Sequence, residues 1–286
     1  MQRIVKRIVI SLADSPRIQG FLVQDQAKGF QVFDAYDGRK YDGREYFDAQ
    51  RAFETLGSTP TGPQIGCAIS HRLVIEEFAD EEGDGQDLLL VAEDDARFIT
   101  DFSKIVDNSL KKVGSVELLL LAEAWNDRDA GVTLSVRRNP SMLMANMSLL
   151  ARFSGKSKWS FRHRIGHTFG SVWGTGLYLI SRRAAKKYKN HFAADGRTHW
   201  IADDYKYWAN LSQIDVMLCR PGLATWEGVS SITPIKSTTE STSGSTRSLF
   251  GVISKRAAPR TRVRRALRSI AGTIAEVREG RKQLGQ

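Results

Sequence analysis

The stretch "DLLLVAEDDARF", from Asp87 to Phe98, gives the clearest indication of the fold. Its first half, Leu88–Ala92, is a continuous apolar run of strand length, which is typical of a strand that is covered on both faces of a parallel sheet. Three consecutive carboxylates, Glu93, Asp94 and Asp95, follow this run. Ligands collect beyond the carboxyl ends of strands in open α/β sheets. The triplet is therefore either a metal or substrate site or a solvated acidic turn, and the stretch alone does not decide between them.

Strand-like and helical runs alternate on both sides of this stretch. The predicted elements are strands at Arg7–Leu12, Phe30–Gly38 and Val116–Trp125, a helix from about Gln64 to Ala79, a strand turning into a helix near Ser181, a helix at Ile201–Leu211 and a last strand at Asp215–Gly222. This alternation predicts an α/β domain with a mostly parallel sheet flanked by helices. The region Asp127–Gly170 has no clean period and is predicted to be a long excursion over an active site.

Composition and charge restrict the class of protein. Of the 286 residues 41% are hydrophobic and 26% charged, as in a soluble globular protein. No apolar run approaches the roughly 18–20 residues of a membrane span, and the N-terminus is predicted to be a first strand, not a signal peptide. Two cysteines, Cys67 and Cys219, make no disulfide framework and lack metal-ligand spacing, so a reducing cytoplasm is expected and Cys67 is predicted to be a small core residue.

The C-terminal part differs in composition from the rest of the chain. We predict a folded domain over residues 1–229, a flexible Ser/Thr-rich linker over 230–250 and a basic amphipathic helix in 251–286. The net charge is +10, and residues 251–286 carry ten Lys or Arg against two Glu, which leaves only +2 for the body. The body is therefore not expected to bind nucleic acid. The tail is expected either to lie on an anionic membrane or to be a solubilising extension.

The spacing of the carboxylates suits a divalent metal ion. Adjacent carboxylates repel one another, which raises their pKa values unless a counter-charge is present. Residues i and i+2 of an extended segment point to the same side, so Glu93 and Asp95 can face one ligand while Asp94 faces elsewhere. Hard oxygen ligands favour Mg²⁺ or Mn²⁺, ions that often share their coordination with substrate phosphates.

Five short motifs occur in order over roughly residues 4–225. They are "ISLADSPR", "AYDG", "GPQIGCAISH", "VAEDD" and "WGTGLYLIS". Together they resemble glycosyltransferase family 25, the lipooligosaccharide galactosyltransferase family that also includes the collagen galactosyltransferases. The resemblance implies a GT-A-type, Rossmann-like fold, a UDP-sugar donor and an inverting transfer to an acceptor hydroxyl. The sequence departs from the family pattern at Ser11, Ala13, Pro63 and Ala92.

The resemblance also implies roles for the carboxylates. Glu93 and Asp95 would hold the divalent ion, Mn²⁺ or Mg²⁺, beside the donor diphosphate, with Asp94 nearby. Family members carry an Asp after the Gly-Thr-x-x-Tyr segment. Asp203 fits that position as the base that takes the acceptor proton, with Asp204 in reserve. The structural alternative for Asp203 is to cap the helix that follows it.

Other matched positions are expected to contact the donor or the acceptor. His71 is expected in such a contact, although a helical His can instead bond a neighbouring backbone group. The further expected donor contacts are Ser70 in the same motif, Arg17 at the phosphates, Asp37 and Gly38 in a turn that holds the nucleoside, and Thr175 and Gly176 near the sugar. Each has an ordinary alternative as a turn, a solvated charge or a tight packing position.

The predicted function is transfer of a hexose, with galactose as the first choice, to a cell-surface glycan such as a lipooligosaccharide or capsule precursor. A cytoplasmic enzyme lying peripherally on the inner face of the plasma membrane would fit the basic tail. One alternative is a non-catalytic module of the same fold that binds membranes or nucleic acid. Another is a metal-dependent nucleotidyltransferase, although no obvious Gly-rich triphosphate loop lies near the N-terminus.

Overall fold

The computed structural model describes residues 2–122, 142–148, 164–168, 174–193, 196–220 and 222–226. The chain divides into two compact units, Met1–Ile232 and Thr233–Gln286, and every described residue lies in the first. The predicted linker and basic helix lie outside the described residues and stay predictions. Among the residues that are described, no helix has the length and apolar character needed to span a membrane.

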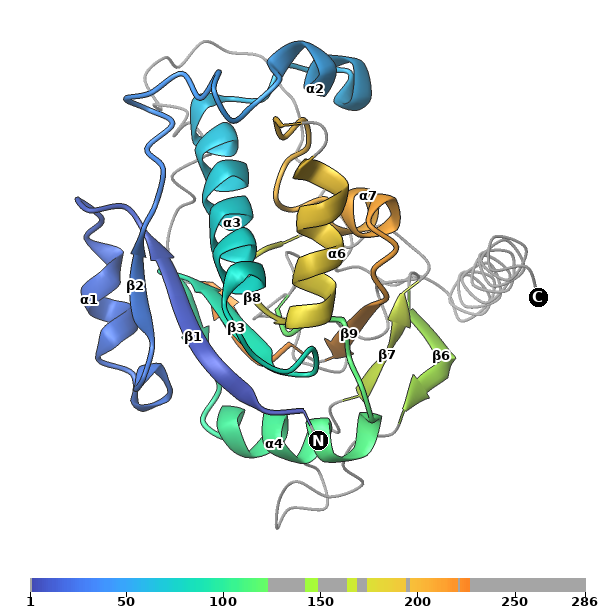
Figure 1. Ribbon diagram of the computed structural model, residues 1–286. Helices are drawn as coiled ribbons and strands as arrows, with labels where there is room; N and C mark the ends of the chain where they lie inside the picture. Colours follow the sequence, from blue (N-terminus) through green and yellow to red (C-terminus); the bar gives the residue numbers. More distant parts are fainter. Residues whose placement is uncertain are drawn as a thin grey trace, which may run out of the picture. The chain divides into compact units, whose positions relative to one another are not determined.

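An eight-stranded sheet forms the centre of the first unit, with the order β2-β1-β3-β8-β5-β9-β7-β6 (Figure 1). The strands are β1 (Ile4–Ser11), β2 (Gln31–Asp34), β3 (Leu88–Glu93), β5 (Leu118–Leu120), β6 (Met142–Ser148), β7 (Arg164–Thr168), β8 (Leu177–Ser181) and β9 (Val216–Arg220). The pairings of β1 with β2, β1 with β3 and β5 with β9 are parallel. Strands β8 and β7 run against their neighbours, so the other six strands share one direction. The predicted mostly parallel sheet is confirmed.

Helices cover both faces of this sheet. The described helices are α1 (Arg17–Leu22), α2 (Ala49–Leu56), α3 (Gly62–Asp80), α4 (Phe102–Val113), α6 (Arg182–Ala193) and α7 (Tyr205–Leu211), with a short 3₁₀ turn at Asp25–Ala27. Helix α2 packs in a separate small cluster and does not cover the sheet. Helices α3, α6 and α7 pack on one face of the sheet and α1 and α4 on the other. Leu89 and Val91 of β3 point into the first core, while Leu88, Leu90 and Ala92 point into the second. This double burial is the physical reason for the unbroken apolar run before the acidic triplet.

Helix α3 begins two residues earlier than the predicted Gln64. Thr61 precedes the helix, and its backbone N–H donates to the Gln64 side chain at 2.8 Å, as in a capping box. Pro63 is tolerated in the first turn because the N–H that it lacks would have no helical partner there. The cap fixes where α3 starts, and therefore where Ser70 and His71 lie on it.

Two further pairings complete the framework around the end of β3. Strand β4 (Ala96–Phe98) pairs antiparallel with β10 (Ala224–Trp226), which brings Trp226 opposite Ala96. Strands β6 and β7, from the region predicted as an irregular excursion, pair with each other at the edge of the large sheet. The rest of that excursion lies outside the described residues.

Candidate functional site

An open pocket of about 100 Å³ lies where β1, β2 and β3 end. The three strands are parallel, with Ile10 opposite Glu93 and Ser11 opposite Asp34, so their carboxyl ends meet at one edge of the sheet. Seven predicted site residues line the pocket: Arg17, Asp37, Gly38, Ser70, His71, Glu93 and Asp94. The pocket therefore gathers residues from four of the five sequence motifs.

Asp94 faces the β1 side, where three side chains donate to its carboxylate. Its carboxylate accepts hydrogen bonds from the hydroxyls of Ser11 at 2.8 Å and Ser15 at 2.5 Å, and it pairs with the Arg17 guanidinium at 2.8 Å. The Asp94 side chain is only 2% exposed. Arg17 also reaches Asp95 at 3.5 Å, so this one cation serves two members of the triplet.

Glu93 and Asp203 approach each other on the opposite side, through Thr175. The Thr175 hydroxyl donates a very short hydrogen bond to Glu93 and lies 3.0 Å from Asp203 Oδ1. The Thr175 backbone N–H donates to the same Asp203 oxygen at 2.8 Å. Glu93 Oε1 also lies 3.5 Å from His71 Nε2. Glu93 and Asp94 point to different sides, but β3 ends at Glu93 and the next two residues form a turn. The predicted alternation therefore does not extend to Asp95, which contacts the same Arg17 as Asp94.

The carboxylates on this side carry more negative charge than their described neighbours offset. Burial, and then the charge of Glu93, raises the pKa of Asp95 to about 7. The same two causes raise the pKa of Asp203. Burial acts to raise the pKa of Glu93 too, but the contact with the His71 imidazole lowers it overall. Glu93 therefore stays ionised, whereas Asp95 and Asp203 hold their protons more tightly than an ordinary Asp.

The donor atoms at this place fit a divalent cation of the Mg²⁺ or Mn²⁺ type. Asp95 Oδ1 is buried and has no hydrogen-bond partner among the described residues, which is costly unless another group satisfies it. Glu93 and Asp95 supply hard oxygen ligands, and these ions prefer such ligands. A bound cation would also offset the repulsion that raises the pKa of Asp95.

Asp203 and Asp204 have different surroundings although they are adjacent. Asp204 is the N-cap of α7, where its side chain accepts from the backbone N–H of Tyr207 at 3.2 Å. Asp203 turns away from that helix to Thr175. The capping role that the sequence left open for Asp203 thus falls to Asp204.

The wall of the pocket formed by α3 is a contact between backbones. A Cβ at Gly38 would lie 1.8 Å from the Gly62 carbonyl oxygen, and one at Gly66 would lie 2.5 Å from the Tyr36 carbonyl oxygen. Ser70 joins the two segments, because its hydroxyl accepts from the Tyr36 N–H at 2.9 Å and donates to the Gly66 carbonyl at 2.7 Å. The turn after β2 is therefore fixed directly on the first turns of α3.

Asp37 lies in this turn and is almost completely buried. Hydrogen bonds from Arg39, at 2.8 Å and 2.7 Å, and a pair with Lys40 at 3.2 Å surround its carboxylate. These contacts, those of Arg39 first, hold the pKa of Asp37 well below its usual range. The turn thus presents a permanently ionised carboxylate at the pocket.

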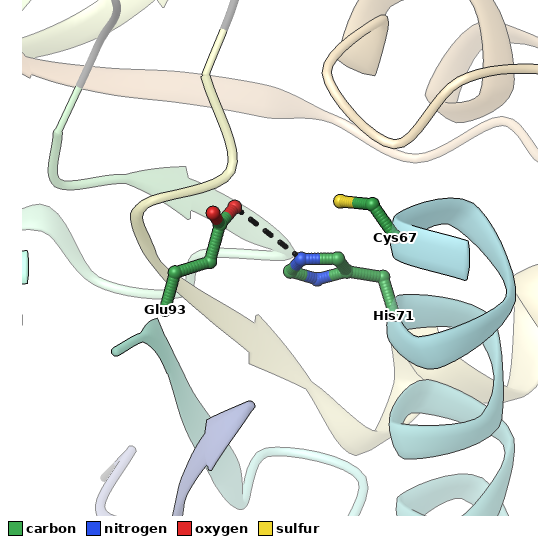
Figure 2. Close-up of side chains that lie close together, drawn as sticks. All are labelled: Cys67, His71 and Glu93. Atoms are coloured by element: carbon green, nitrogen blue, oxygen red, sulfur yellow. Dashed lines mark ion pairs between the residues drawn. The ribbon is translucent and has the colours of Figure 1, made fainter. Parts of the chain in front are cut away.

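The structure adds two residues that the sequence did not assign to the site. A Cβ at Gly176 would lie 2.0 Å from Trp226 Nε1, so Gly176 provides the space for this indole beside Thr175. Cys67 is half-buried, and its sulfur lies with ligand atoms of His71 and Glu93 in a group within 4.8 Å of one another (Figure 2). The signal for Cys67 was its spacing of four from His71 on one helix, which the prediction of a core residue passed over.

The comparison with protein families gives one match. The model for glycosyltransferase family 25, described as an LPS biosynthesis protein, matches residues 4–202, which is more than half of the chain. The matched segment contains Arg17, the turn with Asp37, helix α3 and the acidic triplet, and it ends one residue before Asp203. A comparison with curated proteins finds no match.

Proposed function

The chain belongs to glycosyltransferase family 25, and from this premise we propose that it moves a hexose, with galactose as the first choice, from a UDP-sugar to a glycan hydroxyl. Membership of the family makes it a glycosyltransferase of LPS biosynthesis, with a nucleotide-sugar donor and a glycan acceptor. The UDP-galactose donor, inversion at the anomeric carbon and an acceptor such as a lipooligosaccharide or capsule precursor are the parts that we propose.

The observation that carries the proposal is the meeting of two carboxylates from distant parts of the chain. Glu93, at the end of β3, and Asp203, just before α7, both bind Thr175. Asp95 adds a buried oxygen without a partner among the described residues. A folded protein concentrates uncompensated carboxylates in this way mainly where they act on a ligand.

Donor binding is assigned to the β1 side of the pocket. Arg17 is held by Asp94 and Asp95 but remains 28% exposed, so part of its five-donor guanidinium can reach a diphosphate. The turn with Asp37 and Gly38 lies on the same pocket and would hold the nucleoside. The ionised carboxylate of Asp37 can accept hydrogen bonds from N–H and O–H groups of the ribose or the base.

Glu93 and Asp95 would hold the divalent ion next to that diphosphate. When bound, such an ion stabilises the negative charge that builds on the leaving nucleoside diphosphate. Arg17 would add a second positive charge beside the same phosphates. In the absence of the ion, His71 and Thr175 keep the Glu93 carboxylate in place.

Asp203 is the proposed general base. The acceptor oxygen forms a bond to the anomeric carbon, the bond from that carbon to the donor phosphate oxygen breaks with its electron pair, and the acceptor proton moves to Asp203. The Thr175 backbone N–H donates to Oδ1 of Asp203, and the Thr175 hydroxyl lies beside the same oxygen, which leaves Oδ2 to take the proton. The raised pKa of Asp203, caused by burial and by Glu93, makes it a stronger base than an ordinary Asp.

A donor screen tests this proposal. Purified full-length protein is incubated with Mn²⁺ and a panel of UDP-sugars, and UDP release is measured for the unchanged protein and for Asp95→Ala. We expect UDP-galactose to be hydrolysed or transferred only by the unchanged protein, with loss of the activity when the metal is chelated. No turnover with any UDP-sugar, together with no thermal shift by UDP and Mn²⁺, would refute it.

We further propose that the basic tail holds the enzyme on anionic membrane, where a lipid-linked acceptor would lie. Its excess of eight positive charges can provide about 1 kcal/mol for each basic residue close to the surface. Removing the residues after Ser248 is expected to reduce binding to vesicles that contain anionic lipid and to leave activity on a soluble acceptor within about twofold. Equal vesicle binding by the shortened protein would contradict the membrane role.

A further inference from the structure

Helix α3 presents a sulfur and a nitrogen to the acidic end of β3. Cys67 and His71 are one helical turn apart, so they lie on the same face of α3. Figure 2 shows both side chains directed toward Glu93. A ligand atom of each of the three residues lies within 4.8 Å of those of the other two. The cluster therefore combines one thiol, one imidazole and one carboxylate.

His71 is oriented for a ligand by a contact behind it. Its Nδ1 lies 2.9 Å from the hydroxyl of Tyr178, and both groups are buried. Its Nε2 is buried and makes no hydrogen bond within the described part of the chain, although Glu93 lies 3.5 Å away. Metal-binding imidazoles are commonly held in this way by a partner on the second nitrogen, which fixes the ring and leaves the first nitrogen for the ion.

We propose that Cys67, His71 and Glu93 form a second metal site, selective for a thiophilic ion of the Zn²⁺ type. Sulfur and imidazole ligands favour Zn²⁺ and exclude Mg²⁺, which prefers oxygen alone. A tetrahedral zinc with bonds of about 2.0–2.3 Å holds its ligand atoms about 3.3–3.8 Å apart. Side-chain rotations that move these atoms by about 1 Å would therefore bring them to zinc-binding distances. The fourth position is left for water or a phosphate oxygen.

Formation of the site exchanges a proton for the metal ion. Cysteine binds zinc as the thiolate, so Cys67 gives up its thiol proton when the ion binds. Binding forms the S–Zn bond and releases that proton to solvent. The Glu93 carboxylate beside the sulfur attracts a divalent cation.

Zinc at this place would regulate the proposed transferase by competition. Glu93 belongs to both metal sites, so an ion held by Cys67 and His71 removes a ligand from the Mg²⁺ or Mn²⁺ site. This regulatory part depends on the proposed function, whereas the binding of zinc to the three residues does not. Zinc is therefore expected to inhibit transfer even when Mn²⁺ is in excess.

Cobalt provides the direct test because its thiolate complexes absorb light in the near ultraviolet. Metal-free full-length protein is titrated with Co²⁺ alone, and then with Zn²⁺ as a competitor. The chain has two cysteines, and Cys219 lies in β9, buried in the other core, so Cys67→Ser and Cys219→Ala are matched variants. We expect the thiolate band in the unchanged protein and in Cys219→Ala, its loss in Cys67→Ser, and its displacement by Zn²⁺.

Affinity measurements extend the test to the residue behind the site. Cys67→Ser and Tyr178→Phe are each expected to weaken Zn²⁺ binding at least about tenfold, while Mn²⁺ affinity changes less. Bound Co²⁺ without a thiolate band in the unchanged protein would overturn the proposal whether or not the variants fold. A thiolate band that persists in Cys67→Ser would overturn it as well.

The two proposals fail in distinguishable ways. The cobalt band needs no donor sugar, so a protein without transferase activity can still show the site. If Mn²⁺-dependent UDP-sugar turnover is found but the band is absent, only the zinc site is refuted. Inhibition is measured as the zinc concentration that halves the activity of each variant relative to its own zinc-free rate, and Cys67→Ser is expected to need at least about tenfold more zinc.

Discussion

Asp94 and Asp95 are neighbours in the chain and both contact Arg17, but their carboxylates are satisfied to different degrees. Around Asp94, two serine hydroxyls and Arg17 satisfy the carboxylate. Asp95 has only the longer contact with Arg17 on one oxygen, and its other oxygen is buried without a partner among the described residues. Burial, and then the charge of Glu93, raises the pKa of Asp95. The surroundings of Asp94 are those of a structural ion pair. The surroundings of Asp95 are those of a binding site that still needs its ligand.

The difference teaches which carboxylates to test for chemistry. A satisfied buried carboxylate stabilises the fold, and removing it leaves its hydrogen-bond donors without an acceptor. An unsatisfied carboxylate costs stability and is explained best by a ligand that restores the balance. We therefore propose that Asp94 acts on the donor through Arg17, which it positions, whereas Asp95 and Asp203 act directly.

The largest expected effect is at Asp203. Asp203→Asn keeps an oxygen that can accept from Thr175 but removes the basic group, so kcat is expected to fall about 10²–10⁴-fold. UDP release in the presence of acceptor measures it. The matched variant is Asp204→Ala, which loses the cap of α7 and should lower stability by about 1 kcal/mol with kcat nearly retained. A greater loss of kcat in Asp204→Ala than in Asp203→Asn would show that Asp203 is not the base.

The next effect is at Asp95. Asp95→Asn removes a proposed metal ligand, and a fall in kcat of about 10²–10³-fold is expected, comparable to the loss of one group that stabilises transition-state charge. Thermal unfolding of the metal-free variant should be no easier than that of the unchanged protein, because a charge repulsion has been removed. If metal-free Asp95→Asn is clearly less stable than the unchanged protein, then Asp95 stabilises the fold as Asp94 does, and the proposed difference between them is contradicted.

Asp94→Asn is expected to have its main effect on stability. The amide cannot pair with the Arg17 guanidinium as the carboxylate does, and the free energy of unfolding should fall by about 1–3 kcal/mol. Denaturant titration measures this loss. Activity should fall through a higher KM for the donor, since Arg17 loses its position. If Asp94→Asn leaves the stability unchanged but abolishes kcat, then Asp94 acts directly in the reaction, as proposed for Asp95.

The smallest effect is a dependence of metal-free stability on pH. The folded pKa of Asp95, about 7, lies above its ordinary value of 3.8. The folded state therefore keeps a proton that the unfolded state releases, and stability decreases as the pH rises from about 4 to about 7. Asp203 acts in the same direction, whereas the lowered pKa of Glu93 confines its own effect to a pH below 4.5.

Thermal scans with and without Mn²⁺ check this dependence. Mn²⁺ is expected to raise Tm by several degrees more at about pH 8 than at about pH 5, because at the lower pH it must displace a proton from Asp95. Asp95→Asn serves as the control and should remove most of the difference. An equal shift at both values would show that Asp95 does not bind the ion.

The sequence predicted the parts of the site that depend on short-range geometry. The apolar run Leu88–Ala92 predicted a strand buried on both faces, whereas the expected period of two stopped at Glu93, because Asp94 and Asp95 lie in a turn. The helical period placed Ser70 and His71 on α3 close to its observed bounds. These features need only the chain within a few residues of each position.

The parts that the sequence could not predict depend on contacts between distant segments. No local pattern shows that β8 runs antiparallel between β3 and β5, yet this direction brings Thr175 to Glu93. The choice between Asp203 and Asp204 also depended on where Thr175 lies. Trp226 entered the site through the pairing of β4 with β10, two strands too short to give a period.

The glycine contact between the turn after β2 and helix α3 limits how this enzyme can be re-engineered. Gly38, Gly62 and Gly66 leave no volume for even a methyl group, so libraries that randomise these positions will consist mainly of unfolded protein. Attempts to change donor preference have to act at other lining positions of the pocket, such as Leu12 and Arg39. The backbone contact thus separates the glycine positions, which cannot be changed, from the other lining positions, which are open to design.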